Sequence, residues 1–200
     1  AIQQVEQDRN KEIKAVVHFA NPEKQNYMTY AKALADAGVE YDVFASSYYP
    51  YWHGTLDNLK NQLNAITEKY GKEVMVAETS WATGLEDSDG HANTVREGNN
   101  DAGMDYDFSI YGQAKELREV INAVAEMNKG IGVFYWEPAW IPVKVYDPEA
   151  EDAEQTLATN KAAWEKYGSG WAASYAKEYD AEDAGKWYGG SAIDNQALFD

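Results

Sequence analysis

Three segments of the chain repeat one pattern, in which apolar residues at helical spacing are followed by a glycine and a short apolar run. The helical stripes consist of Tyr27, Ala31 and Leu34, then Leu56, Leu59, Leu63, Ile66 and Tyr70, and then Ile110, Ala114, Leu117, Ile121, Val124 and Met127. Glycine favours the left-handed backbone that ends a helix, which predicts helix ends at Gly38, Gly71 and Gly130. The apolar runs that follow predict strands over 41–45, 73–77 and 131–136.

A fourth apolar run, 14–20, precedes these segments and follows a polar stretch of helical pattern, 1–12. Strands that are apolar throughout are typical of parallel sheets, and four strands separated by helices predict an α/β fold. Polar or aromatic residues follow each strand, as at the active face of a (β/α)8 TIM barrel. Because a complete barrel needs about 250 residues, the repeat predicts roughly half of one. After residue 138 we expect a long loop and no closing helix.

Glu78 ends the strand that begins at Glu73 and is followed by Thr79-Ser80-Trp81. The carboxyl ends of parallel strands are where α/β folds place their chemistry. A carboxylate in this position is either an active-site group or a polar residue that marks the exit of the strand into solvent. This segment alone leaves both interpretations open.

Composition narrows the class of ligand. The net charge of −17 disfavours nucleic acid and anionic membrane surfaces but not a neutral polysaccharide. The aromatic content of 14% supplies flat rings on which sugars stack, although the same rings can fill a core. The absence of cysteine excludes disulfides, zinc–thiolate sites and a cysteine nucleophile. No apolar run is long enough to span a bilayer, and the polar first residues do not have the pattern of a signal peptide.

Longer motifs carry a resemblance to a known family. They are 45–55 (ASSYYPYWHGT), 76–81 (VAETSW), 132–140 (GVFYWEPAW) and 187–197 (WYGGSAIDNQA). In this order they resemble glycoside hydrolase family 53, the endo-β-1,4-galactanases (arabinogalactan endo-β-1,4-galactosidases) of the large clan of barrel glycosidases. The resemblance covers essentially the whole chain. It implies that residues 1–200 form the C-terminal half of a TIM-barrel catalytic domain, with strands that correspond to strands five to eight.

The resemblance implies endo-hydrolysis of β-1,4-galactosidic bonds in type I arabinogalactan or pectic galactan by a retaining mechanism with two glutamates. Glu78 matches the nucleophile. The family's general acid/base lies in an Asn-Glu motif, and this sequence contains none. General acid help is worth roughly 10²–10⁴-fold, so we expect the chain to be inactive alone unless the N-terminal half or a second chain completes the barrel. Glu137 is either a substitute acid or a supporting hydrogen-bond partner.

Residues at the other strand exits are candidates for binding galactan, and core packing is the alternative role for each. Tyr48 and Tyr49 leave the strand beside Glu78, and alternation along the strand sends one inward and the other outward. The resemblance implies that Trp136 stacks beneath the sugar at the cleavage subsite. Candidates for neighbouring contacts are Trp52, Trp81, Trp140 and Glu137. We interpret His18 as a structural residue, because a lone histidine near a strand end usually is one.

Oxygen-bearing residues alternate along 87–93 (DSDGHAN), with a glycine that permits a sharp turn. Alone, this pattern fits either a calcium loop or a solvated turn. The resemblance implies Ca²⁺ bound between the long loops after the last two strands, where it would offset the entropy lost in ordering them. The implied ligands are Asp87, Asp89, His91, Asn93, Ser191 and Asp194.

Two other functions stay open. One is a non-catalytic galactan-binding module, which the missing acid/base favours. The other is a related clan glycosidase that acts on a different β-linked polysaccharide. For the enzyme, the resemblance implies a secreted protein.

Overall fold

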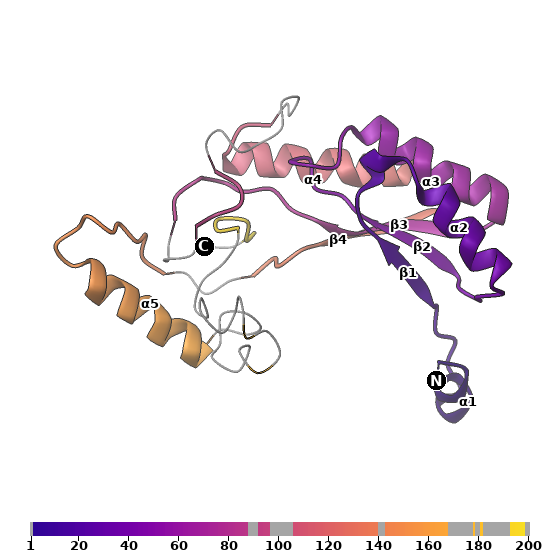
Figure 1. Ribbon diagram of the computed structural model, residues 1–200, viewed down its shortest axis with the longest axis horizontal. Coiled ribbons are helices and arrows are strands. Elements are labelled where there is room, and N and C mark those ends of the chain that lie inside the picture. Colours follow the sequence, from indigo (N-terminus) through magenta and orange to yellow (C-terminus); the bar gives the residue numbers. More distant parts are fainter. Residues whose placement is uncertain are drawn as a thin grey trace. The chain divides into compact units, whose positions relative to one another are not determined.

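The computed structural model describes residues 2–87, 92–96, 106–139, 143–167, 178, 181 and 193–198. Its helices are α1 (Ile2–Arg9), α2 (Tyr27–Asp36), α3 (Leu56–Tyr70), α4 (Ile110–Ala125) and α5 (Ala153–Tyr167), with a short 3-10 helix η1 (Pro22–Lys24). Its strands are β1 (Val16–Phe19), β2 (Val43–Ser47), β3 (Glu73–Thr79) and β4 (Gly130–Tyr135). Figure 1 shows their course along the chain.

Contacts divide the chain into two compact units, the first made of Ala1–Ser80 with Ala114–Trp136 and the second of Trp81–Gln113 with Glu137–Asp200. That residues 1–200 form one half-barrel domain stays a prediction. In the part of the chain that the structure describes, no helix combines the length and the apolar character needed to cross a membrane.

The first unit is built on one sheet of four parallel strands in the order β1-β2-β3-β4. The strands pair in sequence order, with Val16 opposite Val43 and Phe44 opposite Val74. Helices α2, α3 and α4 lie along one face of the sheet (Figure 1). Because all four strands run in the same direction, their carboxyl ends meet at one edge of the sheet. That edge carries Glu78.

Helix α3 shows how the sequence sets the ends of an element. Thr55 Oγ1 accepts a hydrogen bond from the backbone N–H of Asn58 at 3.2 Å, which caps the first turn. Gly71 follows the last residue with a φ of 68°, a left-handed conformation that favours glycine. Its N–H donates to Thr67 O at 2.9 Å. The predicted end of this helix at Gly71 is confirmed.

Gly130 has a different role from the one predicted. Helix α4 ends at Ala125, and Gly130 is the first residue of β4 rather than the stop of the helix. A Cβ atom at Gly130 would lie 1.9 Å from the carbonyl oxygen of Val124. Glycine is therefore needed here because the backbone passes close to the end of the helix, not because the helix needs a left-handed cap.

The central strands of the sheet are buried and the outer strands are partly exposed. Every residue of β2 is buried, whereas Val16 in β1 is 48% exposed and Phe134 in β4 is 66% exposed. Within the described residues, no strand pairs with the outer edge of β1 or of β4. An unpaired parallel edge presents free N–H and C=O groups to which another strand can bind.

Helix α5 lies in the stretch after residue 138 that was expected to be a long loop, so that expectation is wrong. Its buried face consists of Thr156, Asn160 and Trp164, which recur every fourth residue but include two polar side chains. Asn160 fits because its Nδ2 donates to Lys144 O at 2.7 Å and its Oδ1 accepts from Lys144 N at 3.1 Å. A helix that buries hydrogen-bonded side chains shows no apolar stripe, so hydrophobic periodicity does not find it.

Candidate active site

An irregularity in strand pairing positions Glu78 at the end of β3. Strands β2 and β3 pair residue by residue from Val43 to Ser46, but the next residue, Ser47, aligns with Glu78 instead of Ala77. A bulge of this kind bends the strand and re-aims the side chains beside it. The N–H of Tyr48 then donates to Glu78 O at 2.8 Å, which fixes the strand end beyond the irregularity.

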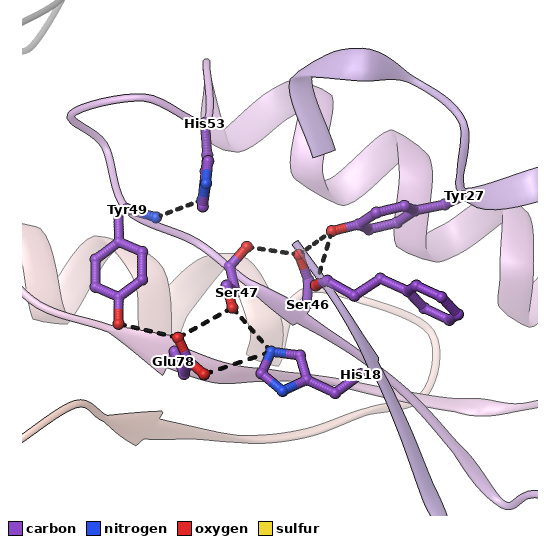
Figure 2. A network of polar contacts seen from close by, with 8 residues as sticks. His18, Tyr27, Ser46, Ser47, Tyr49, His53 and Glu78 are labelled. Carbon is purple, nitrogen blue, oxygen red and sulfur yellow. Dashed lines mark hydrogen bonds and ion pairs between the residues drawn. The ribbon is translucent and has the colours of Figure 1, made fainter. Parts of the chain in front are cut away.

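Glu78 lies in a network of side chains from three neighbouring strand ends (Figure 2). Its Oε2 atom accepts hydrogen bonds from Ser47 Oγ and from the Tyr49 hydroxyl, each at 3.1 Å. His18 Nε2 lies 2.8 Å from Ser47 Oγ and 3.9 Å from Glu78 Oε1. Ser47 has one hydroxyl proton and gives it to Glu78, so His18 Nε2 is the donor in its bond to Ser47.

This arrangement suits a carboxylate that attacks an electrophilic carbon. Two donors hold Glu78 Oε2 and restrict rotation of the carboxyl group, whereas Oε1 accepts no hydrogen bond from the described residues. The side chain is 24% exposed, so a ligand can reach it from the strand exits. A nucleophile that is already oriented loses little further entropy on reaching the transition state.

The backbone around Tyr49 is held by His53. The N–H of Tyr49 donates to His53 Nδ1 at 3.0 Å, and the N–H of His53 donates back to Tyr49 O at 3.0 Å. Both residues are buried. Burial lowers the pKa of His53 below its ordinary value, against opposing effects of Glu23 and Glu78. The ring therefore favours the neutral form, which has a lone pair to accept the hydrogen bond.

Tyr48 points away from Glu78 into the core. Its hydroxyl donates to Gly54 O at 3.0 Å, and burial raises its pKa. Of the two tyrosines at this strand exit, Tyr49 is the one whose side chain contacts the carboxylate of Glu78. A contact with substrate stays a prediction for both.

A second glutamate, which the sequence did not indicate, lies behind the exit of β3. Glu116 on α4 is fully buried, and its Oε1 accepts a hydrogen bond from Thr79 Oγ1 at 2.7 Å. Its Oε2 has no partner among the described residues. Burial raises the pKa of Glu116 to about 7, and the charge of Glu119 acts in the same direction. Because Thr79 directly follows Glu78, this carboxyl group supports the backbone that carries the candidate nucleophile.

A sequence profile described as Glycosyl hydrolase family 53 matches residues 1–200. The chain belongs to this family. An endo-beta-1,4-galactanase of Bacillus subtilis (strain 168) is 54% identical over 195 residues, which cover 96% of this chain and 43% of that protein. An arabinogalactan endo-beta-1,4-galactanase of Humicola insolens is 35% identical over 141 residues, covering 66% of this chain and 40% of its own. The chain thus spans less than half the length of these relatives.

Solved structures of family 53 show the same fold. The Ignisphaera aggregans GH53 catalytic domain superposes with a TM-score of 0.63 at 39% identity, over 70% of this chain and 39% of that one. A structure from work on two fungal beta-1,4-galactanases gives a TM-score of 0.54 at 34% identity, over 66% of this chain and 40% of that one. The prediction of a (β/α)8 TIM-barrel fold is confirmed, with four parallel βα units in this chain.

The tryptophans predicted for family 53 sugar subsites lie in different environments. Trp136 is 43% exposed, and its backbone N–H donates to Thr79 O at 2.9 Å. Trp52 is half-buried, with its ring centroid 5.9 Å from that of Tyr49. Trp81, in the second unit, is fully buried and stacks on Phe108 with centroids 5.0 Å apart. Trp140 lies outside the described residues. Sugar binding by these rings stays a prediction.

Glu137 begins the second segment of the second unit with a φ of 49°, a backbone conformation that is uncommon for a residue with a side chain. Its Oε2 accepts a hydrogen bond from Gln196 Nε2 at 2.7 Å. Gln196 is almost fully buried. The contact ties the segment after β4 to the C-terminal segment, which is compatible with a supporting role for Glu137.

Asn93 connects the two loops predicted to bind calcium. Its Nδ2 donates to Glu86 O at 3.2 Å, and its Oδ1 accepts from Asp194 N at 2.9 Å. The buried side-chain amide of Asn93 thus joins the segments that carry the predicted ligands Asp87 and Asp194. All three residues have oxygen atoms of the kind that Ca²⁺ prefers. The other three predicted ligands lie outside the described residues, namely Asp89, His91 and Ser191.

Within the described residues, no three His, Asp or Glu side chains gather as a metal site. The three described ligands fit calcium in chemistry and in the pairing of their loops. Calcium binding stays a prediction.

Sequence reasoning missed four residues around Glu78, which are Ser47, His18, His53 and Glu116. His18 was interpreted as structural, yet it contacts both Ser47 and Glu78. Ser47 and His53 lie in the family motif 45–55, close in sequence to the candidate Tyr49. That proximity is the one sequence signal that points to them. Glu116 had no signal, because a single glutamate on a helix does not show that it faces the sheet.

Proposed function

We propose that the protein is an endo-β-1,4-galactanase that cleaves internal bonds of pectic galactan and type I arabinogalactan with retention of configuration. Glu78 is the nucleophile. One observation carries the proposal: in a chain of family 53, Glu78 has one carboxylate oxygen held by Ser47 and Tyr49 and the other without a hydrogen bond from the described residues. The names of the relatives from Bacillus subtilis and Humicola insolens support galactan as substrate.

In the first step, Glu78 Oε1 attacks the anomeric carbon while a second carboxyl group protonates the departing sugar oxygen. The product is a galactosyl ester of Glu78. In the second step, water attacks the same carbon, the deprotonated second carboxyl takes up its proton, and Glu78 leaves as a carboxylate. Ser47 and Tyr49 stabilise the charge that returns to Glu78 Oε2 in this step.

The second carboxyl group comes from polypeptide outside these 200 residues. Retaining hydrolysis needs two carboxyl groups about 5–5.5 Å apart, and the sequence contains no Asn-Glu pair. The unpaired edges of β1 and β4, with Val16 and Phe134 exposed, fit a partner that adds the other strands of a barrel. The partner is the N-terminal half of the barrel or a second chain that provides it, and the 200-residue chain alone is inactive.

Calcium, in this proposal, stabilises two segments of the second unit. Asp87, Asn93 and Asp194 would contribute to holding the ion, which would join the loop after β3 to the C-terminal segment. A galactan polymer does not cross a cell membrane, so an enzyme that cleaves internal bonds meets it outside the cell. Secretion follows from the substrate.

The test compares the 200-residue chain with a completed barrel. The completed barrel is this chain fused behind the part of the Bacillus subtilis relative that precedes its matched region. We expect reducing-sugar release from potato galactan by the completed barrel only, and a loss of more than about 10³-fold in Glu78→Gln because the nucleophile is removed. Glu73→Gln is the matched control, since Glu73 lies at the opposite end of β3 and pairs with Lys14.

The other outcomes separate the alternatives. Binding of galactan by both proteins without hydrolysis would identify a galactan-binding module. Hydrolysis of a different β-linked polysaccharide in place of galactan would reject the substrate and keep the reaction. Activity of the 200-residue chain alone that is lost in Glu78→Gln would show that the chain contains its own acid, and Glu137 would be the first residue to test.

A further inference from the structure

We propose that His53 is a positioning residue that acts on Glu78 through Tyr49, and that it does so only as a neutral ring. The inference deepens the proposed function and rests on Glu78 being the nucleophile. His53 touches neither Glu78 nor any group that would react. It holds the backbone of the residue that does touch Glu78.

The contacts form a short chain from His53 to Glu78 (Figure 2). His53 Nδ1 accepts the backbone N–H of Tyr49 at 3.0 Å, and the Tyr49 hydroxyl donates to Glu78 Oε2 at 3.1 Å. The N–H groups of Trp52 and His53 both donate to Tyr49 O at 3.0 Å, so a tight turn closes around Tyr49. The rings of Tyr49 and His53 also meet edge to face, with centroids 5.8 Å apart.

Protonation of His53 would break this chain at its first bond. A protonated ring has an N–H at both nitrogens, so Nδ1 would face the N–H of Tyr49 donor to donor. Both groups are buried, and a buried N–H without an acceptor is costly. The turn would then have to shift, and the Tyr49 hydroxyl would move relative to Glu78.

The surroundings keep His53 neutral. Burial lowers its pKa from an ordinary value of 6.5, and the nearby charge of Lys24 acts in the same direction. Glu23 on η1, Glu78 on β3 and a backbone hydrogen bond with Ser47 act in the opposite direction. Because burial is the largest effect, the neutral ring persists below the pH at which an exposed histidine takes up a proton.

The direction of the pH effect follows. Above its ordinary pKa, His53 is neutral in every state and the contact with Tyr49 is fully formed. As the pH falls through the lowered pKa of the folded protein, His53 gains a proton and Tyr49 is released. The acid side of the activity profile then includes the protonation of His53, and it is steeper in the wild type than in a variant with no titrating side chain at position 53.

Two substitutions separate the acceptor from the titration. In His53→Asn, the side-chain oxygen takes the place of Nδ1 and accepts the Tyr49 N–H but does not titrate. In His53→Leu, the acceptor is lost. In the completed barrel we expect His53→Leu to lower kcat by about tenfold, the size of a weakened hydrogen bond to a charged group, with little change in KM. We expect His53→Asn to recover most of that loss and to give an acid limb that is less steep than that of the wild type.

Tyr49→Phe shows whether the effect passes through the hydroxyl. If it does, adding His53→Leu to Tyr49→Phe lowers kcat no further, whereas independent effects would multiply. Melting temperatures of all variants, measured in the same buffer, identify any loss of kcat that comes from unfolding. Multiplying effects, or an acid limb of unchanged slope in His53→Asn, would overturn the inference.

A second readout does not depend on activity. With ¹⁵N-labelled tyrosine, the amide resonance of Tyr49 is the one that disappears in Tyr49→Phe. It should move with pH as His53 takes up its proton and should lose that transition in His53→Asn. If the completed barrel is active and this resonance does not titrate, the inference fails and the proposed function stands. If the completed barrel is inactive, the proposed function fails, and a resonance that does not titrate would then also reject the contact with His53.

Discussion

We expect the protein to lose stability between weakly acidic and neutral pH, and replacing Glu116 by glutamine should remove most of that loss. Glu116 is fully buried, and burial raises its pKa from 4.5 to about 7. Below the lower value, the carboxyl group binds a proton in the folded and the unfolded chain alike. Between the two values only the folded chain keeps the proton, so the free energy of unfolding falls as the pH rises.

The size of the decrease follows from the width of this window. Each pH unit between 4.5 and 7 lowers the free energy of unfolding by about 1.4 kcal/mol, which gives about 3 kcal/mol in total. Above the window the loss is constant, because the carboxyl is ionised in both states. Glutamine stays neutral and still accepts the Thr79 hydroxyl, so Glu116→Gln should be more stable than the wild type at mildly alkaline pH by up to this amount.

The assay is urea unfolding of the 200-residue chain, followed by circular dichroism across this pH range. The decisive quantity is the difference in slope against pH between the wild type and Glu116→Gln. Glu126→Gln is the control, since Glu126 directly follows the same helix, is exposed and pairs with Lys60 at 3.2 Å. Equal slopes for the wild type and Glu116→Gln would show that Glu116 does not titrate in this window and would refute the reasoning.

Other expectations follow from the caps, the loops and the open edge of the sheet. Thr55→Ala should lower the free energy of unfolding by about 1 kcal/mol through loss of the α3 cap, measured by the same urea assay, and an unchanged value would contradict the role of the cap. Gly71→Ala should lower the free energy of unfolding by a similar amount, because φ at this position is 68°. Gly132→Ala should not lower it, because an added Cβ meets nothing within 4 Å there. Equal losses for the two variants would argue against backbone strain at Gly71. EDTA should lower the melting temperature and Ca²⁺ should restore it, and no response to either would remove the calcium proposal. Phe134→Asp should weaken activity recovered when the other half of the barrel is supplied as a separate chain, since Phe134 is exposed on β4, and undiminished recovery would show that this edge is not the joint.

The strands of the sheet and the helices that pack on it could be predicted from the sequence. Their buried residues are apolar, and such residues recur at helical spacing or form short continuous runs. Helix α5 could not, because it buries Asn160 through paired hydrogen bonds to the backbone of Lys144. Glu78 could be placed at a strand exit from the pattern alone. Its partners could not, since the bulge that aligns Ser47 with Glu78 depends on strand pairing that no local pattern encodes.

Among the described residues, the side chains that hydrogen-bond or ion-pair with Glu78 come from β1, β2 and the turn that follows β2. If Glu78 is the nucleophile, as proposed, these neighbouring strands already determine its orientation before any other polypeptide completes the barrel. Under the same proposal, exchange of the other half between members of the family would alter the acid and the substrate contacts without disturbing this geometry. Recombination between the two halves of the barrel is thus a route by which such enzymes can diversify. The contacts that orient Glu78 would stay together on one side of the point of recombination.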